Sequence, residues 1–159
     1  MLERFPMTKE GYNQLLQKRN HLKDEVLPKI LIEVQVAREH GDLSENAEYK
    51  FGKEAQRNTE RRIGEIGYKL VNSEIIDISS IPEDDVVIFG STVTFINLSV
   101  DEKITYKIVG EDEADLDQNK MSYLAPVAKN AIGKEPGDVI EVHTNDGIIE
   151  YEIDEVEYI

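Results

Sequence analysis

A short polar stretch joins two long helical patterns and reads REHGDLSENAEY over residues 38–49. Before it, apolar residues recur at helical spacing as far as Ala37. Thr8 precedes this pattern and is suited to cap the helix. After it, a second helical pattern runs from Ala47 to Leu70. Two helices of about 30 residues joined by so few residues must lie antiparallel. The sequence therefore predicts a coiled-coil hairpin with this stretch at its tip.

Two residues mark irregular points in the first helix. Pro28 lacks a backbone N–H and should bend the helix near Asp24–Pro28 without ending it. Gly41 is suited to the C-terminal cap, because glycine adopts the positive φ that such caps require. We therefore expect one long, bent helix that ends just before the tip.

The second half of the chain differs in charge and in pattern. Residues 1–78 hold 13 basic and 14 acidic side chains, whereas residues 79–159 hold 5 and 19. The second half is also rich in β-branched and aromatic residues, between turn signals such as Asn145-Asp146-Gly147. We expect strands at Val86–Phe89, Thr92–Leu98, Ile104–Val109, Met121–Leu124, Val139–Thr144 and Ile148–Val156, and one short helix at Pro126–Ile132.

These patterns predict an α+β fold with two structural units. An antiparallel two-helix coiled-coil hairpin occupies residues 1–77, and a small sheet domain with one short helix occupies residues 86–159. Residues 78–85, with a proline and three consecutive acids, are the expected linker.

Composition excludes several classes of protein. The chain has 159 residues, a net charge of −15 and no cysteine, which rules out disulfides, thiolate zinc sites and a cysteine nucleophile. No apolar run approaches the ~18 residues of a membrane span. The first six residues do not form a signal peptide, so we expect a cytoplasmic protein. The strong acidity argues against wrapping duplex nucleic acid by bulk charge.

Asp42 and Glu45 are the candidate functional residues of the tip. In one interpretation Asp42 caps the second helix, and Glu45 completes a capping box three residues later. In the other, both carboxylates point outward as hard oxygen ligands for Mg²⁺. Two ligands are too few for a tight site, so phosphate, water or a partner would have to supply the rest.

A basic stretch follows the tip. Residues 50–69 hold six basic and three acidic side chains. They form either a solvated, ion-paired helix face or a stripe that attracts a phosphate backbone.

The tip sequence resembles the signature of the Gre transcript-cleavage factors of bacteria, and the likeness covers nearly the whole chain. The matching stretches are residues 37–49, Met7–Tyr12, Val109–Asp115, Ser122–Gly133 and Val156–Tyr158. The resemblance implies that the C-terminal domain is similar in fold to FK506-binding proteins and docks at the secondary channel of backtracked bacterial RNA polymerase. The coiled coil would then enter the channel, where Asp42 and Glu45 help to hold a second Mg²⁺.

The resemblance also implies roles for other residues. The polymerase itself would cut the extruded RNA 3′ end, so we expect the factor to have no complete active site of its own and no tightly bound cofactor beyond the shared Mg²⁺. The oligomeric state is open from the sequence, and we expect a monomer. Residues that steady the tip or touch RNA are Ser44, Asn46 and Tyr49. Residues that contact the extruded RNA are Lys50, Lys53 and Arg57. Residues that dock on polymerase are Asp112, Glu113, Ser122 and Pro126.

One departure from the family pattern lies in the docking region. Ala125 stands where relatives usually have a polar residue that caps the following helix, and Leu124 is unusually apolar. The docking contacts inferred from Pro126 and its neighbours depend on this segment.

Three alternatives compete with a cleavage factor. An anti-cleavage relative would occupy the same channel but inhibit; such relatives have altered tips, whereas this tip keeps the cleavage pattern. A plain coiled-coil adaptor would make no use of the tip. A prolyl isomerase or chaperone needs an aromatic-lined apolar pocket, and the sequence shows no tryptophan and no evident aromatic cluster.

Overall fold

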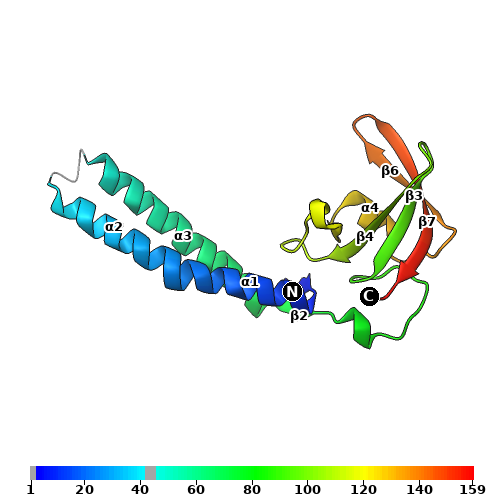
Figure 1. The fold of residues 1–159 in the computed structure, drawn as a ribbon, viewed down its shortest axis with the longest axis horizontal. Helices are drawn as coiled ribbons and strands as arrows, with labels where there is room; N and C mark the ends of the chain where they lie inside the picture. Colours follow the sequence, from blue (N-terminus) through cyan, green and yellow to red (C-terminus); the bar gives the residue numbers. More distant parts are fainter. Residues whose placement is uncertain (1–2, 42–45) are drawn as a thin grey trace. The chain divides into compact units, whose positions relative to one another are not determined.

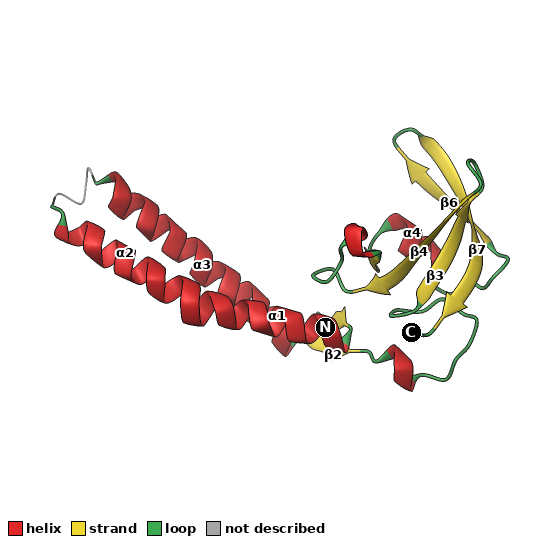
Figure 2. Cartoon of the chain, viewed as in Figure 1, coloured by secondary structure: helices red, strands yellow, loops and turns green. Residues whose placement is uncertain are grey.

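The computed structural model describes residues 3–41 and 46–159, which form two compact units (Figures 1 and 2). The first unit consists mainly of Asn13–Ser73. The second unit combines Phe5–Tyr12 with Glu74–Ile159. The predicted α+β class, with a helical hairpin followed by a sheet domain, is confirmed. The predicted limits at 1–77, 78–85 and 86–159 stay a prediction.

The hairpin consists of a long first helical run and a single returning helix (Figure 1). The first run comprises α1 (Lys9–His21), a π-helical segment η1 (Leu22–Val26) and α2 (Leu27–Glu39). The returning helix is α3 (Ala47–Val71), which packs along α2.

The π-helical segment lies where the sequence predicts a bend. The backbone N–H of Leu27 bonds to the carbonyl of Leu22, five residues earlier, instead of the usual four. Pro28 follows directly, in the first turn of α2. Proline has no backbone N–H to donate, and the wider π turn before it tolerates the missing hydrogen bond. The helical run therefore continues past Pro28, as predicted.

Close approach of the two hairpin helices depends on a glycine. Val34 and Ala37 of α2 and Ile66 and Leu70 of α3 are buried. A Cβ atom at Gly52 would lie 2.8 Å from Val34 Cγ2, which is too close for any larger residue without a shift. Gly52 is thus a packing position, and not only a weak point in the helix.

The second unit is built around a five-stranded sheet of order β5-β4-β3-β7-β6. The strands are β3 (Thr92–Asn97), β4 (Glu102–Val109), β5 (Lys120–Ser122), β6 (Val139–Thr144) and β7 (Gly147–Glu157). Neighbours are antiparallel except β4 and β5. The predicted hairpin turn at Asn145-Asp146 is confirmed, since Thr144 pairs with Gly147 on either side of it.

Shorter elements complete the chain. A separate two-stranded sheet pairs β1 (Phe5–Met7) with β2 (Ser73–Ile75), which sequence analysis did not predict. Two 3₁₀ turns, η2 (Ile78–Ser80) and η3 (Leu116–Gln118), also appear. The predicted short helix is α4 (Pro126–Ala131).

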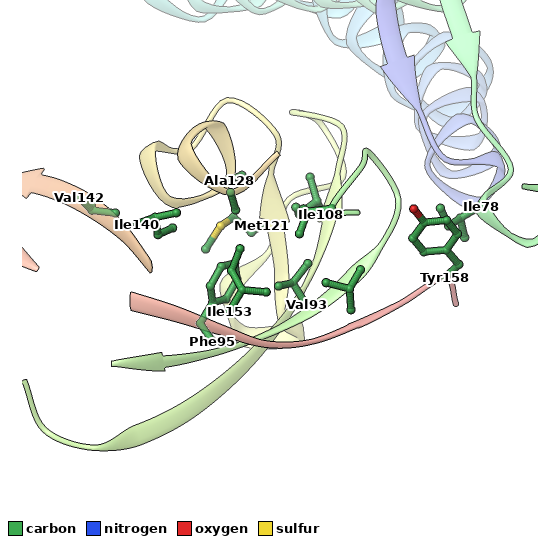
Figure 3. Close-up of a cluster of buried hydrophobic side chains, with 13 residues drawn as sticks. Ile78, Val93, Phe95, Ile108, Met121, Ala128, Ile140, Val142, Ile153 and Tyr158 are labelled. Carbon is green, nitrogen blue, oxygen red and sulfur yellow. The ribbon is translucent and has the colours of Figure 1, made fainter. Parts of the chain in front are cut away.

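The core of the second unit lies between the sheet and α4 (Figure 3). Val93 and Phe95 alternate along β3 with less buried residues, and both are fully buried, as the two-residue period of a strand dictates. Ala128 of α4 faces Met121 and Ile153 across this core (Figure 3). One face of the sheet therefore carries the hydrophobic core of this unit.

One predicted strand is wrong. Residues 86–89 form a loop, although their apolar character is typical of a strand. Val87 is fully buried, and it bonds to Lys134 through its N–H and to Gly133 through its carbonyl. The apolar run thus reflects burial of a loop against the turn after α4, which periodicity alone does not distinguish from a strand.

Candidate functional site

The helix end before the tip has the predicted form. α2 ends at Glu39, His40 occupies the C-cap position, and Gly41 follows with φ of +121°. The positive φ explains the glycine at this position. The predicted tip residues Asp42, Ser44 and Glu45 lie outside the described residues, so their predicted roles stay predictions.

The helix start after the tip corrects one interpretation. α3 begins at Ala47, and its N-cap is Asn46, whose Oδ1 accepts a hydrogen bond from Tyr49 N at 3.1 Å. The capping role that one interpretation gave to Asp42 therefore belongs to Asn46. Asn and Asp are both good N-cap residues, so residue type alone does not distinguish the two positions.

Asn46 also joins the two helices. Its Nδ2 donates to the carbonyl of Ala37 at 2.8 Å, nine residues earlier on α2. One side chain thus satisfies an N-terminal N–H of α3 and gives the Ala37 carbonyl a second donor, beside the His40 N–H at 3.2 Å. This double contact fixes the spacing of the two helix ends that flank residues 42–45.

A second cross-helix contact lies beside Asn46. The Arg38 guanidinium carbon is 5.8 Å from the centre of the Tyr49 ring, within range of a cation–π interaction. A hydrogen bond with Arg38 also lowers the pKa of the Tyr49 hydroxyl below its ordinary value. The structure therefore places two of the predicted tip-support residues, Asn46 and Tyr49, at the base of the tip.

The predicted RNA-contact residues share one face of α3. Lys50, Lys53 and Arg57 follow the three- and four-residue spacing of a single helix face. Lys53 Nζ donates to Gln56 Oε1 at 3.3 Å. The ion pairs of the basic stretch lie further along, where Glu65 is 3.8 Å from Arg61 and 3.9 Å from Arg62. The region therefore combines a basic face near the tip with an ion-paired face beyond it.

The predicted docking residues follow one edge of the sheet. β4 and β5 are parallel and Val109 pairs with Ser122, so residues just after these strands lie close together. Asp112 follows β4, while Pro126 is the exposed first residue of α4. The N-cap of α4 is Ala125, which makes no side-chain capping bond, consistent with the departure noted in the sequence.

Glu113, the remaining docking candidate, has a structural role. Its side chain is only 3% exposed, and its Oε2 accepts a 2.5 Å hydrogen bond from Thr8 Oγ1. Thr8 in turn accepts from Gly11 N at 3.0 Å, as expected of a helix cap. Lys120 Nζ lies 3.8 Å from the other Glu113 oxygen. This contact leaves no signal in the local sequence, because 105 residues separate the partners.

An aromatic-lined pocket of about 210 Å³ opens on the sheet domain. Phe95, Tyr106 and Tyr151 line it, together with Met121 and Val127. The sequence shows no evident aromatic cluster in this domain, but the folded domain brings one together. The three rings come from three strands, and only the sheet order brings them together.

Within residues 3–41 and 46–159, no cluster of three His, Asp or Glu side chains has an arrangement that could hold a metal ion. Within the same ranges, no helix has the length and apolar character needed to span a membrane.

Comparisons with known proteins cover almost the whole chain. Residues 82–158 match the model described as "Transcription elongation factor, GreA/GreB, C-term", and residues 5–75 match "Transcription elongation factor, N-terminal". The transcription elongation factor GreA of Yersinia pestis bv. Antiqua (strain Angola) is 47% identical over 99% of this chain and 100% of its own.

Further relatives agree in coverage. The transcription elongation factor GreA of Legionella pneumophila (strain Corby) is 48% identical, over 99% of both chains. Among solved structures, the GreA factor homolog 1 protein of Thermus thermophilus is 24% identical, with a TM-score of 0.44 and coverage of 98% of this chain and 99% of its own.

Proposed function

The chain belongs to the GreA/GreB family of transcription elongation factors, and from this premise we propose that it binds backtracked bacterial RNA polymerase and stimulates cleavage of the nascent RNA 3′ end. The family identity makes the polymerase elongation complex the partner. The polymerase active centre carries out the hydrolysis, and the factor supplies ligands without a complete active site of its own.

The observation that best supports this proposal is the double contact of Asn46. It holds the ends of α2 and α3 at a fixed spacing on both sides of residues 42–45. α3 alone has 25 residues, which is about 38 Å of helix at 1.5 Å per residue. A long hairpin whose two helix ends are joined by hydrogen bonds is suited to reach a site enclosed within another protein.

The chemistry of the tip follows from its two carboxylates. Asp42 and Glu45 offer the oxygen ligands that Mg²⁺ prefers, and phosphate, water and polymerase groups would complete the coordination. A second metal ion supplies charge stabilisation in phosphodiester hydrolysis. Each tenfold acceleration needs about 1.4 kcal/mol of transition-state stabilisation, a modest demand on two carboxylates in a confined site.

Two further surfaces of the chain would contribute contacts to the complex. The basic face formed by Lys50, Lys53 and Arg57 lies on α3 just beyond the Asn46 cap, where it attracts the phosphates of extruded RNA. The sheet edge with Asp112 and Pro126 provides the docking surface on polymerase. In this proposal the factor acts as a monomer in the cytoplasm.

The experiment adds the protein to artificially stalled elongation complexes. Shortened RNA that polymerase can extend again is the expected result, and the shortening should require Mg²⁺. Protection of the RNA from intrinsic cleavage would instead identify an anti-cleavage relative. Unchanged RNA despite polymerase binding would contradict both roles and favour a plain adaptor.

A further inference from the structure

The hairpin has an exposed apolar groove that the proposed function does not use. The groove has a volume of about 550 Å³ and lies between α2 and α3 in the half of the hairpin nearer the tip. Its large apolar side chains are strongly exposed: Ile32 by 65%, Val36 by 48% and Phe51 by 72%. Three such side chains together on one surface are unusual for a surface that only faces water.

The helix spacing explains why these side chains gather. Ile32 and Val36 are four residues apart and therefore adjacent on α2. Phe51 lines the groove from α3, beside Gly52, where a Cβ atom would lie 2.8 Å from Val34 Cγ2 on α2. The groove is thus a consequence of the same packing that forms the hairpin.

The negative charge beside this groove restricts which kinds of ligand can bind there. Glu33 and Glu48 are exposed and also line it, so an approaching phosphate backbone would be repelled. The basic residue Lys53 lies two positions after Phe51, about 200° around the helix, on the opposite side. RNA and the groove ligand therefore use different faces of α3. The complementary ligand is a protein segment with an apolar side chain flanked by Lys or Arg.

The size of the groove restricts the partner further. Eight residues line it, whereas a stable protein interface uses about 20–30 residues on each side. The groove is too small to hold a second copy of the chain in a stable dimer. It is large enough to add a contact inside a complex that other surfaces already hold, where the effective concentration is high.

We propose that this groove binds an apolar side chain from a basic segment of RNA polymerase when the hairpin is engaged. The proposal rests on the proposed function, which makes polymerase the partner. It adds a contact on the flank of the hairpin, distinct from the tip carboxylates and from the basic face of α3. The contact would hold the hairpin at one rotation about its long axis.

Site-specific crosslinking tests the identity of the ligand. The photoreactive residue p-benzoylphenylalanine replaces Phe51 in the full chain, which is bound to a stalled elongation complex and irradiated. We expect an adduct with a polymerase peptide that has Lys or Arg next to an apolar residue. The same probe at Tyr68, an exposed aromatic position of α3 outside the groove, should not label that peptide. An adduct only with RNA or a second copy, or no adduct, overturns the proposal.

Substitutions test the contribution to binding. Phe51→Ala should raise the dissociation constant for the elongation complex about five- to tenfold, as for a moderate interface residue. Phe51→Leu should restore most of the affinity. Glu33→Lys with Glu48→Lys should also weaken binding, because it reverses the charge beside the groove. Thermal unfolding should change little, since Phe51 is exposed.

The controls separate this inference from the proposed function. Wild-type protein that neither binds polymerase nor shortens stalled RNA would contradict the proposed function itself. If the wild type is active and Phe51→Ala matches it in both affinity for polymerase and RNA cleavage, the groove proposal alone is contradicted.

Discussion

The Asn46 side-chain amide donates to the Ala37 carbonyl at 2.8 Å, and this bond connects the end of α2 with the start of α3. Because the same side chain caps α3 through Tyr49 N, one residue contacts both helix ends beside the tip. Positioning of a functional group improves when its supporting residues lie on rigid elements. Asn46 is therefore the residue through which the fold and the function of the tip are coupled.

Two substitutions separate the two bonds of Asn46. Asn46→Ala removes both bonds and should destabilise the hairpin by about 1–2 kcal/mol. Asn46→Asp keeps the cap acceptor but cannot donate to Ala37, so it should cost less stability while still reducing cleavage stimulation. Denaturation followed by the helical circular dichroism signal, with cleavage of stalled complexes, provides both measurements. Equal stability and activity of wild type and Asn46→Ala would contradict this role.

The Thr8–Glu113 hydrogen bond predicts a matched pair of variants. Thr8→Val has nearly the same shape but leaves the buried Glu113 carboxylate without a donor and Gly11 N without its cap. The expected loss is about 1–3 kcal/mol in the free energy of unfolding. Thr8→Ser keeps the hydroxyl and should lie close to wild type in chemical denaturation. If Thr8→Val and Thr8→Ser had the same free energy of unfolding, the Thr8 hydroxyl would not contribute to stability.

The missing cap of α4 predicts a stabilising substitution. Ala125 occupies the N-cap with an extended backbone and makes no side-chain bond. Ala125→Ser supplies a hydroxyl that can accept from the first free N–H groups of α4, with an expected gain of about 1 kcal/mol. The unfolding temperature should rise by about 4 °C in calorimetry. Ala125→Val, which lacks a hydroxyl, should give no such increase.

Tyr158 predicts a dependence of stability on pH. Its hydroxyl donates to the Val86 carbonyl at 2.6 Å, and burial raises the pKa of Tyr158 above its ordinary value. A raised pKa means that its contribution is complete below about pH 10 and is lost as the pH rises through the folded value. Tyr158→Phe should therefore cost about 1 kcal/mol at neutral pH, with the difference shrinking above pH 10. A difference that does not change with pH would contradict this assignment.

The sequence predicts elements whose determinants are local. The long helices follow from apolar spacing sustained over many turns, and the β6–β7 turn follows from Asn145-Asp146-Gly147. The apolar run around Val87 predicts a strand, but the segment is a loop, because burial in a loop produces the same apolar pattern. Local pattern therefore predicts element type well where the segment is long or the turn is specific.

Contacts between distant segments could not be predicted in the same way. The bond between Thr8 and Glu113 and the aromatic pocket formed by Phe95, Tyr106 and Tyr151 depend on which segments the fold brings together. The Asn46 contact with Ala37 is closer in sequence but needs the geometry of the turn. Residue types identified the candidate site, whereas its supporting contacts required coordinates.

The central claim is that the hairpin delivers Asp42 and Glu45 to the active centre of polymerase. The most direct measurement compares wild type with Asp42→Asn combined with Glu45→Gln on stalled elongation complexes. We predict that the double variant competes with wild type for polymerase at similar concentrations but no longer accelerates RNA cleavage. Acceleration equal to that of wild type, at equal occupancy of the polymerase, would contradict the account.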